Sequence, residues 1–161
     1  MMACLTTHSM AAPASDTVIL RCKACQVMNR VPAKRLTQNP LCGKCKALLD
    51  FPLKPLQVTA STIEQEMADW PEALLIMFCS EGSSDCKTTD PAVVDLAFFR
   101  AGRIKVLKVD VDKDPGIALL YAVNTTPTLL CFRNGQQAGR FEGTTKEQSE
   151  LSQWIKKTLS I

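Results

Sequence analysis

Residues Ile104–Gly135 read IKVLKVDVDKDPGIALLYAVNTTPTLLCFRNG, and this stretch decides the fold class. Its opening IKVLKVDV alternates apolar and polar residues for most of its length, which is typical of a β-strand. Asp114-Pro115 then favours a short helix over Gly116–Val123, because proline suits the first turn of a helix. The apolar run TLLCF predicts a second strand, and the Asn134-Gly135 that follows is a strong hairpin signal. The order strand, helix, strand and hairpin predicts an α/β fold with a mixed sheet.

The flanking sequence extends this pattern in both directions. The run ALLIMFC at Ala73–Cys79 is apolar throughout, as expected of a strand that is buried on both faces. Further elements are predicted from apolar periodicity and helix-start signals: helices over 61–70, 91–100 and 146–159, and a returning strand over 138–141.

The N-terminal part carries a metal-binding pattern, C-x2-C-x16-C-x2-C, formed by Cys22, Cys25, Cys42 and Cys45. Two such pairs supply four thiolates for a tetrahedral zinc ion, and four protein ligands leave no open position for catalysis. We therefore expect one structural zinc per chain, with two disulfides or a redox pair as the alternative. Four cations flank the cysteines and are expected to lower the thiol pKa values: Arg21, Lys23, Lys44 and Lys46. Gly43 is expected to take a positive φ in the second turn.

Charge divides the 161 residues into two parts. Residues 1–56 carry 8 basic and 2 acidic side chains, whereas residues 57–161 carry 11 basic and 14 acidic ones. This asymmetry predicts separate modules, with boundaries that we place as follows: a flexible tail over 1–18, a zinc ribbon over 19–50 and an α/β domain over 51–161.

Composition and segment lengths narrow the class of protein. With 46% hydrophobic and 22% charged residues, the chain has a globular composition. No apolar run approaches the roughly 18–20 residues that span a bilayer, and the first fifteen residues lack the features of a secretory signal. Cys4 and His8 in this tail are expected to have no function. These features predict no membrane partner and a cytoplasmic location.

The chain resembles the thioredoxin family over most of its length. The stretch Ile104–Gly135 is similar to the C-terminal half of a thioredoxin, and the ribbon is similar to the N-terminal extension of bacterial thioredoxin-2-type proteins. The resemblance implies a thioredoxin fold, in which helices flank a mixed central sheet, preceded by the small zinc ribbon. It also implies that the Thr126–Pro127 bond is cis and that these two residues border a groove for an extended protein or peptide substrate.

The redox motif of that family is altered in this chain. Aligned without a gap, Met77–Cys86 places Cys86 at the second motif cysteine, but Ser83 where the nucleophilic cysteine belongs. Met77 stands at the position of the buried acid, and Cys79 and Gly82 replace two tryptophans. A serine hydroxyl offers no thiol–disulfide exchange, and methionine accepts no proton.

Three functions remain open at this point. The first is a protein- or peptide-binding module that uses Thr126 and Pro127 and has no ordinary reductase activity. The second retains redox chemistry through the displaced pair Cys79 and Cys86, or through Cys86 alone. In the third, the ribbon is the functional part and binds protein or nucleic acid. Its sequence argues against nucleic acid, because Phe51 is the only aromatic residue among the first 56. Cys131, inside an apolar run, is expected to belong to the core. The oligomeric state does not follow from the sequence.

Overall fold

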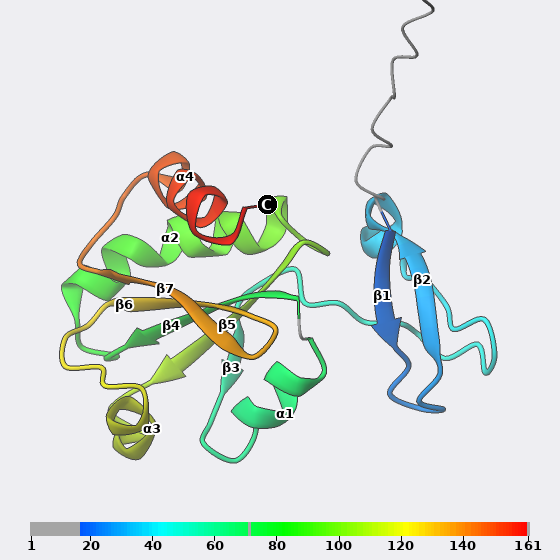
Figure 1. Ribbon diagram of the computed structural model, residues 1–161, viewed down its shortest axis with the longest axis horizontal. Helices are drawn as coiled ribbons and strands as arrows, with labels where there is room; N and C mark the ends of the chain where they lie inside the picture. The colour runs from blue at the N-terminus through cyan, green and yellow to red at the C-terminus, as the bar shows by residue number, and fades with distance from the viewer. Residues whose placement is uncertain (1–16, 71, 161) are drawn as a thin grey trace, which may run out of the picture.

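The structure is a computed structural model that describes residues 17–70 and 72–160. The tail predicted over residues 1–18, with Cys4 and His8, lies almost wholly outside the described residues. Figure 1 shows the described part as two bodies, a small ribbon beside a larger α/β domain.

The ribbon is built on a two-stranded antiparallel sheet of β1 (Thr17–Arg21) and β2 (Met28–Pro32). A 3₁₀ helix, Ala33–Gln38, follows β2. An isolated bridge between Leu41 and Leu48 then closes a second turn. The loops at the two turns carry the four ribbon cysteines.

The α/β domain has one five-stranded sheet in the order β3-β5-β4-β6-β7. The first three strands in this order are parallel to one another. Strand β6 is antiparallel to both of its neighbours, β4 and β7. The strands are β3 (Leu56–Val58), β4 (Ala73–Cys79), β5 (Ile104–Asp110), β6 (Thr128–Arg133) and β7 (Gln136–Glu142). The helices are α1 (Ile63–Ala68), α2 (Ser84–Phe99), α3 (Pro115–Leu120) and α4 (Gln148–Leu159).

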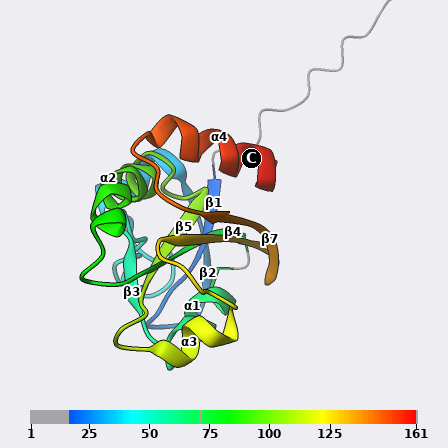
Figure 2. The ribbon, with the colours of Figure 1, turned by 90° about the vertical axis from the view of Figure 1, so that its left-hand side faces the viewer.

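Helices cover both faces of this sheet (Figures 1 and 2). All seven residues of β4 are buried, as its sequence predicts. Alternate residues of the strand pack into two different clusters. In the first cluster, Leu75, Met77 and Cys79 lie with residues of α2 and α4. Leu74, Ile76 and Phe78 lie in a cluster that includes Ile63 of α1 and Ile117 of α3. Among the described residues, no helix is both long and apolar enough to cross a membrane.

Several predicted boundaries are wrong. The helix predicted over 91–100 begins seven residues earlier, at Ser84, with Pro91 inside it. The helix predicted over 61–70 covers only Ile63–Ala68. The short strand β3 was not predicted, and the strand predicted over 138–141 extends in both directions to become β7.

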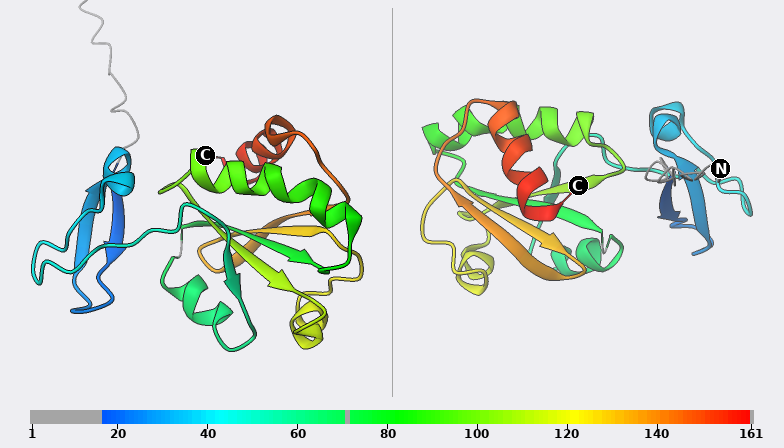
Figure 3. Two further views of the ribbon diagram at one scale, coloured as in Figure 1. Left: turned by 180° about the vertical axis from the view of Figure 1, so that it is seen from behind. Right: turned by 45° about the horizontal axis from the view of Figure 1, so that its top comes forward.

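Apolar side chains of the ribbon pack against the α/β domain, and Figure 3 shows the ribbon beside the domain from two further sides. Buried ribbon residues and domain residues form one continuous apolar cluster. Phe51 and Trp70 meet edge to face, with ring centroids 5.0 Å apart. Gly102, before β5, has a φ of +82°, and a Cβ there would lie 2.6 Å from side-chain atoms of Val18 and Leu36. A side chain at Gly102 would therefore separate the two bodies.

Candidate functional site

The four ribbon cysteines lie in two turns with the same hydrogen-bonding pattern. In the first turn, the Cys22 amide donates to the carbonyl of Val27 at 2.9 Å, and the Gln26 amide donates to the carbonyl of Cys22 at 2.8 Å. The second turn repeats both bonds around Cys42, at 2.8 and 3.1 Å. Gln26 and Lys46, which follow the second cysteine of each turn, have φ values of 62° and 63°. The two turns thus present matching pairs of sulfur atoms.

The four sulfur atoms form one compact cluster. All Sγ atoms lie within 4.8 Å of one another. The Cys22–Cys45 and Cys25–Cys42 sulfur distances are 3.5 and 3.6 Å. A tetrahedral ion with Zn–S bonds of about 2.3 Å separates its sulfur ligands by about 3.8 Å, so the residues fit such an ion closely. All four are free thiols, which does not support the two-disulfide alternative.

Backbone amides, rather than the flanking cations, are the leading cause of the low pKa values of Cys22 and Cys42. An amide hydrogen bond from Cys45 lowers the pKa of Cys42 to about 6, with smaller contributions from the Lys44 amide and from Asn29. The corresponding amide of Cys25 lowers the pKa of Cys22. The turns therefore favour thiolates at Cys22 and Cys42, and the thiolate is the form that binds a metal. At Cys45 an amide hydrogen bond from Ala47 is outweighed by burial and by the three other cysteines, which raise the pKa of its thiol to about 11.

Asn29 is a supporting residue that the sequence analysis missed. Its amide nitrogen lies 3.5 Å from Cys42 Sγ, and its Oδ1 accepts a 2.9 Å hydrogen bond from the Gly43 amide. Gly43 was expected at a positive φ, but this expectation is wrong: the positive φ values of the turns belong to Gln26 and Lys46. No spacing rule would have identified Asn29, because it reaches the second turn from the start of β2.

A second group of sulfur atoms lies at the carboxyl end of β4. Cys79 ends this strand, and Cys86 lies in the first turn of α2. The two form a disulfide with a Cα–Cα distance of 5.8 Å, inside the range of ordinary disulfides. Both residues are buried, with exposed fractions of 4% and 5%. The displaced pair that the sequence left as an alternative is therefore brought together.

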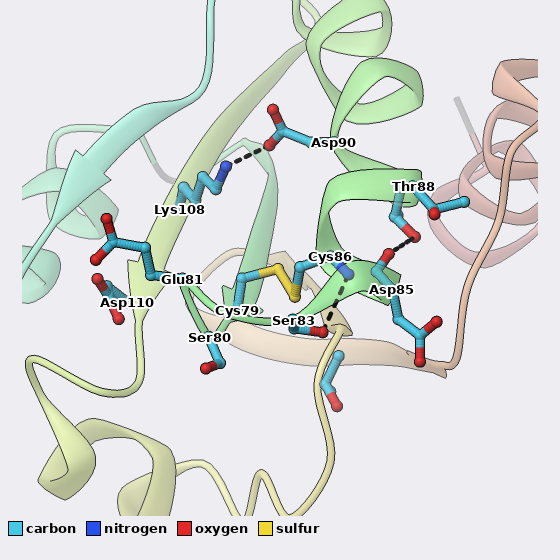
Figure 4. The surroundings of a disulfide bond; sticks show 12 residues. Cys79, Ser80, Glu81, Ser83, Asp85, Cys86, Thr88, Asp90, Lys108 and Asp110 are labelled. Atoms are coloured by element: carbon cyan, nitrogen blue, oxygen red, sulfur yellow. Dashed lines mark hydrogen bonds and ion pairs between the residues drawn. A yellow bond between two sulfur atoms is a disulfide. The ribbon is translucent and has the colours of Figure 1, made fainter.

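Ser83, at the position of the family's nucleophile, has a structural partner. It is the N-cap residue of α2, and its Oγ accepts a hydrogen bond from the Cys86 amide at 3.2 Å (Figure 4). A serine at this position satisfies one of the amides that the first helical turn leaves unpaired. It therefore fixes the start of the helix that carries Cys86.

We expect Ser83→Ala to lower the free energy of unfolding by about 1 kcal/mol, because the alanine cannot accept the Cys86 amide hydrogen bond. Urea unfolding of the two proteins measures the difference. Ser84→Ala is the matched control, since Ser84 is the next residue and is exposed. Equal effects of the two substitutions would contradict the capping role.

The disulfide borders a cavity of about 390 Å³. The cavity is lined by both cysteines and by charged side chains of α2, β5 and two loops; the charged residues are Glu81, Lys87, Asp90, Lys108, Asp110 and Lys113. Asp90 and Lys108 form an ion pair across it (Figure 4). The cavity thus combines buried sulfur with acidic and basic groups, a combination found at sites of proton-coupled chemistry.

The remaining predicted site residues lie elsewhere. Met77 is fully buried in the cluster beneath α2 and α4. The Thr126–Pro127 bond is cis, the form that the resemblance implies. Thr126 and Pro127 are not among the residues that line the cavity beside the disulfide. Cys131 is buried in the core, and burial raises the pKa of its thiol to about 12.

Two family models match the chain. The model described as thioredoxin matches residues 54–157, and the model described as the N-terminal part of thioredoxin 2, a zinc ribbon, matches residues 21–47. The second match includes all four ribbon cysteines. Together the two models account for the α/β domain and for the ribbon in the observed order.

Curated relatives and solved structures agree with these matches. "Thioredoxin 1" of Nostoc sp. is 35% identical over 103 residues, covering 64% of this chain and 95% of the relative. "Thioredoxin C-3" of Corynebacterium nephridii is 26% identical over 142 residues, covering 88% and 96%. The structure of a mutant thioredoxin from Halobacterium salinarum matches with a TM-score of 0.61 and 26% identity, covering 69% of this chain and 96% of that one.

Proposed function

The chain belongs to the thioredoxin family, and from this membership we propose that it is a thiol–disulfide oxidoreductase whose redox pair is Cys79 and Cys86. The pair has the spacing C-x6-C in place of the family's C-x2-C. The ribbon would serve as a structural support that holds one zinc ion.

The observation that carries this proposal is the Cys79–Cys86 disulfide. A redox pair must be able to close into a disulfide without moving the backbone far, and a Cα–Cα distance of 5.8 Å meets this requirement. The position of Cys86 in the first turn of α2 supports the same reading, because the helix dipole favours a thiolate there.

In this proposal the attacking sulfur differs from that of a C-x2-C protein. Ser83 cannot form a mixed disulfide, and its hydroxyl already accepts the Cys86 amide. Thiol–disulfide exchange with the substrate would instead begin at Cys79 or Cys86, which border the cavity beside the disulfide. Because both cysteines are buried, we propose that the protein accepts fewer substrates than a C-x2-C protein and reacts with them more slowly.

A protein- or peptide-binding module is the second candidate. Membership of a family that acts on protein substrates supports it. Thr126 and Pro127, placed before the edge pair β6 and β7, would pair with an extended segment of the partner. We also propose the cytoplasm as the location, where reduced thiols such as the four of the ribbon persist.

The test combines a thiol count with a turnover assay on the wild-type chain. Alkylation under denaturing conditions, before and after reduction, should show that the pair at Cys79 and Cys86 opens and closes reversibly. The protein should then accelerate the reduction of insulin disulfides by dithiothreitol. Turnover no faster than dithiothreitol alone would overturn the redox proposal and favour the binding module.

A further inference from the structure

An ion pair lies beside the proposed redox pair and has no assigned role. Asp90 follows Cys86 by four residues in α2, so both side chains project from the same face of the helix. Lys108 lies on β5 opposite Met77, on the sheet face that packs against α2. The Lys108 ammonium contacts the Asp90 carboxylate, and both line the cavity that Cys79 and Cys86 also line (Figure 4).

Thiol–disulfide exchange at a buried pair needs a proton acceptor close to it. Only the thiolate attacks a disulfide, and a thiol with an ordinary pKa near 8.5 is mostly protonated at neutral pH. Both cysteines are at least 95% buried, so bulk water has little access to them to take the proton. A carboxylate that faces the same cavity can take the proton as the sulfur attacks.

Three carboxylates line this cavity, and two of them are less suited. Glu81 has a side chain that is 78% exposed, and its carboxylate lies 3.9 Å from Lys113. Asp110 is held by the same lysine at 3.3 Å. Burial raises the pKa of Asp110, but hydrogen bonds from the Asp112 amide and from Lys113 outweigh this and hold the pKa below its usual value. Both oxygens of the Asp110 carboxylate are therefore engaged, one by the Asp112 amide and the other by Lys113.

Asp90 differs from both. Its side chain is 36% exposed, and it lies on the helix that carries Cys86, one turn further along. Its partner Lys108, 30% exposed, contacts the carboxylate and holds the Asp90 side chain at the wall of the cavity. The remaining charged groups that face this cavity are Lys87 of α2 and Lys113 after β5. The cavity also gives water a path by which a proton can leave Asp90.

We propose that Asp90 is the proton acceptor of the Cys79/Cys86 pair, an inference that rests on the proposed redox function. In the first step, one cysteine thiolate bonds to a substrate sulfur, and the other substrate sulfur leaves as a thiolate and takes a proton from water. In the second, the remaining thiol gives its proton to Asp90, and its sulfur attacks the mixed disulfide. The protein disulfide forms, and the released substrate thiolate takes up a proton. Two electrons pass from the protein dithiol to the substrate disulfide, and an external dithiol restores the pair.

The test is the pH dependence of one round of oxidation. The reduced full-length protein is mixed with excess 2-hydroxyethyl disulfide between pH 5 and 9, and closure of the Cys79–Cys86 bond is followed by acid quench and alkylation. Asp90→Asn removes the acceptor and keeps the size of the side chain. Asp95→Asn is the matched control, because Asp95 is an exposed aspartate of the same helix.

We expect Asp90→Asn to slow closure near pH 7 by about 10²-fold, the usual contribution of a general base. Its rate should then rise about tenfold per pH unit, since hydroxide must replace the carboxylate. Asp95→Asn should match the wild type. Asp90→Ala should regain speed when formate is added, because the cavity can admit the small acid, and this readout also serves if the asparagine variant folds poorly.

The possible outcomes distinguish a failure of the proposed redox function from a failure of the proposed role of Asp90. A wild-type pair that the probe does not oxidise would overturn the proposed function. A wild-type pair that closes normally, with Asp90→Asn giving the same pH profile as Asp95→Asn, would overturn the role of Asp90 alone. The absence of any formate effect on Asp90→Ala would do the same.

Discussion

Removal of the metal from the four-cysteine site is expected to unfold residues 17–49 and to leave the five-stranded sheet in place. The ribbon has only about 30 residues, and chains of this size rarely bury enough apolar surface to fold without a metal or disulfides. Binding of structural zinc contributes about 10–16 kcal/mol to folding at pH 7. Without the ion, thiolates that lie within 4.8 Å of one another would repel.

Elemental analysis should give one zinc per chain in protein purified without chelators. Hydrogen exchange before and after chelation then locates the unfolding: amides of β1 and β2 should lose protection, and those of β4 should keep it. Less than about half an equivalent of zinc, or unchanged exchange in the ribbon, would contradict the prediction.

Tryptophan fluorescence gives an independent readout of the same event. Trp70 packs against Phe51 at the junction with the ribbon, whereas Trp154 packs against Phe141 on the other side of the domain. Chelation should therefore change the emission of the wild type. The Trp70→Phe variant, which retains Trp154, should show little change.

The parts of the fold that local rules determine could be predicted from the sequence. Asn134 and Gly135 have φ values of 52° and 74°, the positive pair that a tight hairpin turn requires, and this is why the dipeptide located the β6–β7 hairpin. The run Ala73–Cys79 is buried at every position because helices cover both faces of the sheet. The four ribbon cysteines come together because their spacing fits two identical turns.

The start of α2 could not be predicted by the same rules. Pro91 suggested a helix start, because proline fits the first turn and normally disrupts a helix interior. The structure places Pro91 inside α2 and the true start at the Ser83 cap. Cys86 and Asp90 share a helix face because the helix begins before Cys86.

The direction of Cys79 was the second unknown. A residue that ends a strand can point to either face of the sheet, so the sequence left the disulfide open. In the structure Cys79 alternates with Met77 and Leu75 on the face beneath α2, which brings it to Cys86. Long-range packing of α2 on β4, rather than any local motif, therefore creates the pair.

Replacement of either cysteine of this pair is expected to reduce disulfide-reductase turnover to the level of dithiothreitol alone. Exchange requires one sulfur to attack the substrate and a second to release it, so Cys79→Ser and Cys86→Ser should be equally inactive in the insulin assay. The variant that keeps the attacking cysteine should accumulate a mixed disulfide with the substrate. Mass analysis of that species would identify which cysteine attacks first.

Two further variants show whether the loss comes from chemistry or from damage to the fold. Cys131→Ser changes a buried cysteine outside the pair, and it should keep wild-type turnover. Adding Ser83→Cys to Cys79→Ser places a thiol at the half-buried cap, three residues before Cys86, and should restore a weak activity. The activity should stay weak because Met77 supplies no proton acceptor under that position and Ser83 does not border the cavity that holds Asp90. Full activity in Cys79→Ser alone would show that Cys79 is not part of the redox pair.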